Sequence, residues 1–163
     1  MNIILAALVI SGAAFYNAYF RDRPGEGQFL EIRDDASGKV IKKFSMQEGE
    51  EFAIEFIHSV HQSPVRESFI IEDKVIRPIS ARFYSLGAGI QSDLDGDQVM
   101  SRDGDALLIT GFNSSFRELN YIVGTVSDHL LIIGDETISL RDLCGKNAHI
   151  VIRISGGKTN ESS

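Results

Sequence analysis

The chain has a single cysteine, Cys144, among its 163 residues. This excludes an intramolecular disulfide, a redox cysteine pair and a disulfide-stapled secreted scaffold. Positive charge is also scarce: 16 Lys and Arg stand against 23 Asp and Glu, which gives a net charge of −7. Nucleic acids are bound through clustered cations, and the sequence contains no such cluster. We therefore expect no nucleic-acid partner.

Charged side chains are also missing from residues 2–20. A helix of that length, rising about 1.5 Å per residue, nearly crosses a hydrocarbon layer of about 30 Å. We expect residues 1–20 to be a signal-anchor that holds the protein in the cell membrane by a single pass, with the domain on the extracytoplasmic side. The alternative is a signal peptide that is cleaved near Ser11–Ala13, after which the protein is exported. Arg21 and Arg23 follow the apolar run, so charge alone does not decide the orientation.

After the apolar run, the sequence predicts one β domain. Residues 21–27 have linker composition, residues 28–155 form short runs of alternating apolar and polar side chains, and residues 156–163 form a polar, flexible tail. About ten short strands predict an all-β fold, an antiparallel sandwich or small barrel, preceded by one N-terminal hydrophobic helix. Asp103-Gly104 predicts a two-residue hairpin turn, and Pro78 predicts that its strand lies at a sheet edge.

The stretch Glu51–Ile71 holds the densest group of chemically capable side chains. Alternation places His58 on the same strand face as Phe56, and it places Glu67 on the same face as Phe69. A carboxylate that is buried alone costs several kcal/mol, so Glu67 needs a partner. We predict that His58 is this partner, either as a structural pair that fixes strand register or as a recognition centre.

Several short motifs, taken in order, resemble a known bacterial family. They are Phe56-Ile57-His58-Ser59-Val60, Pro64-Val65-Arg66-Glu67, Gly87-Ala88-Gly89, Gly124-Thr125, Asp128-His129-Leu130 and Ile138-Ser139-Leu140. Over residues 29–154 this order is similar to domain-of-unknown-function family 1850. Proteins of that family are small, begin with a signal or anchor, and tend to be encoded beside TAXI-type tripartite (TRAP) transporters. The resemblance implies an extracytoplasmic accessory to solute uptake, with TRAP transporter subunits as candidate partners.

Three classes of function remain open. The first is a membrane-tethered accessory domain that binds a partner. The second is a small-ligand or metal site, for which His58, His61, Glu67 and His129 could act as donors, although His58 and His61 would point to opposite faces of a continuous strand. The third is a hydrolase, but no nucleophile elbow or metalloprotease helix is present, so we assign no catalytic residue, metal or cofactor. The candidate ligand- or partner-binding residues are His58, Ser59, His61, Arg66, Glu67, Gly87 and Gly89.

Overall fold

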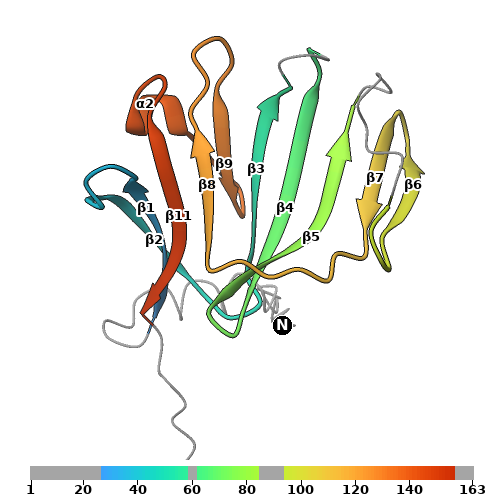
Figure 1. The fold of residues 1–163 in the computed structure, drawn as a ribbon, viewed down its shortest axis with the longest axis horizontal. Helices are drawn as coiled ribbons and strands as arrows, with labels where there is room; N and C mark the ends of the chain where they lie inside the picture. Colours follow the sequence, from blue (N-terminus) through green and yellow to red (C-terminus); the bar gives the residue numbers. More distant parts are fainter. Residues whose placement is uncertain (1–26, 59–61, 85–93, 157–163) are drawn as a thin grey trace, which may run out of the picture.

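The computed structural model describes residues 27–58, 62–84 and 94–156, which form two antiparallel sheets and one short helix (Figure 1). In spatial order, the smaller sheet contains β2 (Val40–Met46), β1 (Gln28–Asp34), β11 (His149–Gly156) and β8 (Glu118–Ile122). The larger sheet contains β10 (Glu136–Ser139), β9 (His129–Ile133), β3 (Glu51–Ile57), β4 (Pro64–Glu72), β5 (Val75–Phe83), β7 (Ala106–Thr110) and β6 (Val99–Asp103). The helix α2 (Leu140–Cys144) follows β10 directly.

The predicted all-β antiparallel fold is confirmed, and the two sheets pack face to face without closing into a barrel. The core lies between them, where alternate residues of each strand point inward. Leu30 and Ile32 of β1 are fully buried in one cluster with Ile54 of β3 and Leu131 of β9. Burying such a side chain stabilises the fold by about 1.5–3 kcal/mol, so this inter-sheet cluster fixes which faces meet.

Two local predictions need correction. Strand β5 is internal rather than at an edge, since it pairs with both β4 and β7. Pro78 is tolerated because it lies next to a register shift in the β4–β5 pair, and β7 pairs only with Ala81–Phe83. The β6–β7 hairpin exists, but its two-residue turn is Gly104-Asp105, because Asp103 already pairs with Ala106.

The larger sheet extends beyond the smaller one, so that β7, β6 and the end of β5 that pairs with β7 project past the region where the sheets stack (Figure 1). The segment between β7 and β8 returns along the part of β5 that β7 leaves unpaired. There, Phe116 and Ile76 exchange two backbone hydrogen bonds of 2.8 Å each. This segment carries the chain from the larger sheet to the smaller one, and it forms one wall of the candidate site below.

The predicted anchor over residues 1–20 lies outside the described residues, as do residues 21–26 of the linker and 157–163 of the tail. Among residues 27–58, 62–84 and 94–156, no helix is both long enough and apolar enough to cross a membrane.

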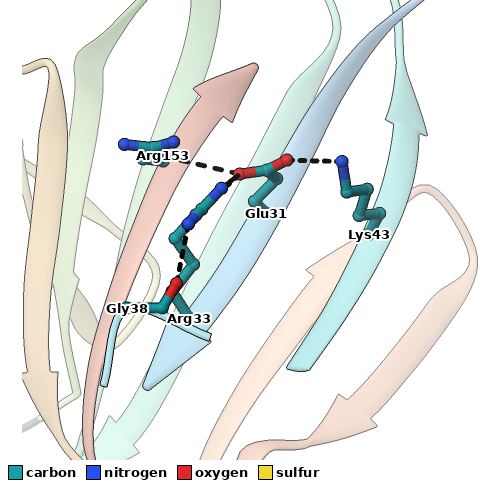
Figure 2. A network of polar contacts seen from close by, with 5 residues as sticks. All are labelled: Glu31, Arg33, Gly38, Lys43 and Arg153. Atoms are coloured by element: carbon teal, nitrogen blue, oxygen red, sulfur yellow. Dashed lines mark hydrogen bonds and ion pairs between the residues drawn. The ribbon is translucent and has the colours of Figure 1, made fainter. Parts of the chain in front are cut away.

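The outer face of the smaller sheet carries a buried charge network centred on Glu31 (Figure 2). Glu31 is 1% exposed. Lys43 Nζ lies 2.7 Å from its Oε1, while Arg33 Nη2 and Arg153 Nε lie 2.7 Å and 3.5 Å from its Oε2. Burial alone would raise the pKa of Glu31. Hydrogen bonds from Lys43, Ser155 and Arg33 outweigh it and hold the pKa at about 2, against an ordinary 4.5.

Because the pKa of Glu31 is lowered in the folded state, its stabilising contribution is complete above pH 4.5 and is lost as the pH falls toward about 2. We expect this loss to be about 1–3 kcal/mol, since its cationic partners are partly exposed and solvent screens them. Urea unfolding between pH 6 and pH 2.5 measures it. Glu31→Gln should lower stability at pH 6 and flatten the pH dependence, whereas Glu51→Gln, at an exposed position, should do neither. An unchanged pH dependence in Glu31→Gln would contradict this assignment.

Candidate ligand-binding site

Glu67 points from β4 into the space between the two sheets, as the alternation predicted. Its neighbours on the same face, Val65 and Phe69, are buried. The partner of its carboxylate is Tyr121 of β8, whose hydroxyl donates a hydrogen bond of 2.8 Å to Glu67 Oε2. Burial raises the pKa of Tyr121 well above its usual range, and the negative charge of Glu67 acts in the same direction. Tyr121 therefore remains a protonated donor at neutral pH.

The prediction that His58 is the partner of Glu67 is wrong. In the β3–β4 pair, Glu67 lies opposite Ile54, while His58 follows the last paired residue of β3. Four residues separate Ile54 from His58, which is about 13 Å along a strand. Glu67 was correctly placed on the inner face of its strand, but His58 lies beyond the end of β3, and the turn between the strands offsets the two residues along the sheet.

His129 of β9 extends the polar group at the end of the core. It lies opposite Phe56 in the β3–β9 pair, and the two rings stack with centroids 5.1 Å apart. The ring of Tyr121 meets His129 edge-on at 5.9 Å. The backbone N–H of Gly124 donates to His129 Nδ1 at 3.2 Å, so the neutral ring carries its proton on Nε2. Burial lowers the pKa of His129, which favours this neutral form.

Asp128 fixes the start of β9 against helix α2. Its two carboxylate oxygens accept hydrogen bonds from the Ser139 hydroxyl and the Arg141 N–H, and Ser139 in turn caps the helix by accepting from the Asp142 N–H. Gly124 is required in the preceding turn, because an added Cβ would lie 2.2 Å from the carbonyl oxygen of Ser127. Together these contacts hold His129, and the ring of Tyr121 beside it, in place.

A cavity of about 490 Å³ lies next to the Glu67–Tyr121 pair, on the side away from His129 and under the projecting part of the larger sheet. We call it the aromatic groove. Its lining residues come from β4, β5, β8 and the segments that flank β6 and β7: Glu67, Phe69, Pro78, Ser80, Ala81, Gln98, Phe112, Ser114, Phe116, Leu119, Asn120 and Tyr121. One carboxylate among four aromatic rings distinguishes this groove from the other cavities.

His58 lies in a different cavity of about 550 Å³, at the end of the sandwich. Phe56, His129, Gln62 and the Gly124–Ser127 turn also line it, and the Ser127 hydroxyl donates to the Ile57 carbonyl at 3.4 Å across it. Both nitrogens of His129 are committed in its neutral form, one accepting from Gly124 and one carrying the proton. This arrangement does not favour a metal ligand, and the described residues contain no group of three or more His, Cys, Asp or Glu that could hold a metal ion.

Arg66 does not lie at the groove. It is next to Glu67 on β4, so it points to the opposite face, where it lines a third cavity with Glu48, Glu50 and Glu51. Ser59, His61, Gly87 and Gly89 lie outside the described residues. Of the three candidate residues that the structure describes, Glu67 alone lines the aromatic groove.

A family model, Domain of unknown function (DUF1850), matches residues 52–140, which is more than half of the chain. The chain belongs to the DUF1850 family. No curated protein and no solved structure matches it. The matched residues include Glu67, Tyr121, Gly124 and the Asp128-His129 pair, so the DUF1850 region contains the whole polar group described above.

Tyr121 is the residue that the sequence reasoning missed. It lies in β8, which spans residues 118–122 and ends just before the Gly124 turn. The available signal was the alternation of Leu119, Tyr121 and Val123, which places Tyr121 on an apolar face. Its contact with Glu67 joins residues 54 positions apart in different sheets, and no local pattern encodes that.

Tyr121→Phe should lower the free energy of unfolding by about 1–3 kcal/mol, because it removes the donor from a carboxylate within the sandwich and leaves the ring in place. Tyr84→Phe is the matched control, since Tyr84 is exposed and its loss should change stability by less than about 0.5 kcal/mol. Chemical denaturation of both variants measures the difference. Equal effects of the two substitutions would show that the Tyr121–Glu67 contact does not support the fold.

Proposed function

We propose that this DUF1850 protein is a membrane-tethered, extracytoplasmic binding domain that serves as an accessory to a TRAP-type solute uptake system. The uncharged run at residues 2–20 supports the tether. Family membership supports the accessory role through the expectation, given by the resemblance, that such proteins are encoded beside these transporters. The chemistry of the candidate site then indicates what the domain binds.

The aromatic groove is the observation that carries the binding role. Its volume of about 490 Å³ lies within the range of sites for small organic ligands, about 300–1,000 Å³. The lining is mostly apolar, with a few polar groups that can orient a ligand, chiefly Glu67, Gln98 and Asn120. Both sheets contribute to it, so a bound solute would contact both of them. We therefore place the solute in this groove rather than in the cavity beside His58.

A thermal-shift screen of small organic solutes, on the full chain in a mild detergent, tests whether the groove binds a ligand. We expect at least one small organic solute to raise the melting temperature by several degrees, since a ligand at 100 times its Kd stabilises a protein by about 2.7 kcal/mol. Ala81→Trp and Ser114→Trp, which fill the groove from β5 and from the β7–β8 segment, should abolish the shift. Ser101→Trp, at an exposed position on β6, should keep it. Shifts that survive both groove substitutions would place the ligand elsewhere.

Purification of the full-length protein from its native membrane in a gentle detergent tests the accessory role. We expect TRAP transporter membrane or solute-binding subunits to co-purify, and mass spectrometry of the same sample reports whether residues 1–20 are retained. An Asp105→Asn variant, altered at an exposed turn, is the control for handling losses. Recovery of the protein alone, while other membrane complexes stay intact, would contradict an accessory role without affecting the groove result.

A further inference from the structure

We infer that the aromatic groove binds an organic ammonium cation, most favourably a quaternary or fully alkylated one. The inference rests on the proposed function, because it names the chemical class of the solute that the groove takes. Two properties of the lining support it independently: its charge and its aromatic content.

The charge of the lining has one sign. Among the described residues that line the groove, Glu67 has the only charged side chain, and none is Lys, Arg or His. The hydrogen bond from Tyr121 orients the Glu67 carboxylate but does not neutralise it. An anionic solute in this groove would lose its hydration and face a like charge with no cation to compensate, so the lining selects against carboxylates. A cation would be attracted to the Glu67 carboxylate, and this attraction would compensate for the hydration that the cation loses.

The aromatic content specifies the kind of cation. Phe69, Phe112, Phe116 and Tyr121 line the groove, and the faces of such rings attract cations through their quadrupole. A strongly hydrated ammonium with several N–H groups would need an acceptor for each of them, which the aromatic part of the lining does not supply. An alkylated ammonium needs few, because its methyl groups contact the rings while its charge faces Glu67. A recognised use of cation–π contacts in proteins is the binding of quaternary ammonium groups.

The rings are held in place before any ligand binds. Phe69 stacks on Phe52 with centroids 5.2 Å apart. The backbone bonds to Ile76 hold the segment that carries Phe116, and Tyr121 is fixed by Glu67 and by the edge contact with His129. Preorganised walls reduce the entropy that binding must overcome. The polar group at the end of the core thus orients the carboxylate and one aromatic wall of the same groove.

Isothermal titration calorimetry of the full chain with choline and with its uncharged isostere, 3,3-dimethylbutan-1-ol, tests the inference. The detergent should be a maltoside, because phosphocholine detergents carry the same cation. We expect choline to bind at least about tenfold more tightly than the alcohol, which is about 1.4 kcal/mol. Glu67→Gln should remove this preference while keeping an acceptor for Tyr121. Glu118→Gln, at an exposed position on β8, makes the same change in net charge and should preserve the preference.

Phe116→Leu provides a second variant that does not alter charge. Phe116 is 40% exposed, so the fold should tolerate the change, and we expect choline affinity to fall by about threefold to tenfold while the alcohol is little affected. Equal affinity for choline and the alcohol, an unaltered preference in Glu67→Gln, or no heat with either probe would each overturn the ammonium assignment. Such results would leave the proposed binding role standing if the solute screen still finds a ligand that the groove substitutions abolish.

Discussion

A β-sheet with one apolar face must bury that face, and the two sheets of this protein differ in width. The four strands of the smaller sheet cover one part of the seven-stranded sheet, where Leu30, Ile32, Ile54 and Leu131 form the core. Strands β7 and β6 and the end of β5 that pairs with β7 project beyond this cover. The β7–β8 segment supplies part of what is missing through Phe112 and Phe116, but it leaves a cavity between itself and the sheet. The groove is thus a direct consequence of unequal sheets.

The polar group formed by Glu67, Tyr121 and His129 lies where the fully covered core gives way to this groove. A hydrogen bond between the sheets joins Glu67 and Tyr121, while His129 is held by a stacked ring and by a backbone N–H from a turn that only glycine fits. A half-buried polar group of this kind is tolerated when its hydrogen bonds are made, and it then fixes geometry that apolar packing alone leaves loose. Here the geometry that it fixes is one end of the aromatic groove.

Two carboxylates of the fold, the buried Glu31 and the half-buried Glu67, serve different purposes. Glu31 lies on the outer face of the smaller sheet beneath three cationic side chains, and its charge is compensated from within the chain. Glu67 has a neutral phenol as its partner, so its charge is oriented without being compensated. Compensated charges stabilise folds, whereas an uncompensated charge that faces a cavity is available to a ligand. This difference in charge compensation, more than the volume of the groove, is the reason for placing Glu67 at the centre of the candidate site.

The sequence by itself determined the all-β class, the approximate bounds of most strands, the hairpin between β6 and β7 and the inward direction of Glu67. These properties depend on side-chain period and turn residues within about ten positions, which a single strand or hairpin encodes. Only the tertiary structure decided that Glu67 meets Tyr121 rather than His58 and that Pro78 lies in an internal strand. Those outcomes depend on how far paired residues of a hairpin are offset along the sheet and on which sheet each strand joins. Both are set by the burial of residues far apart in the sequence.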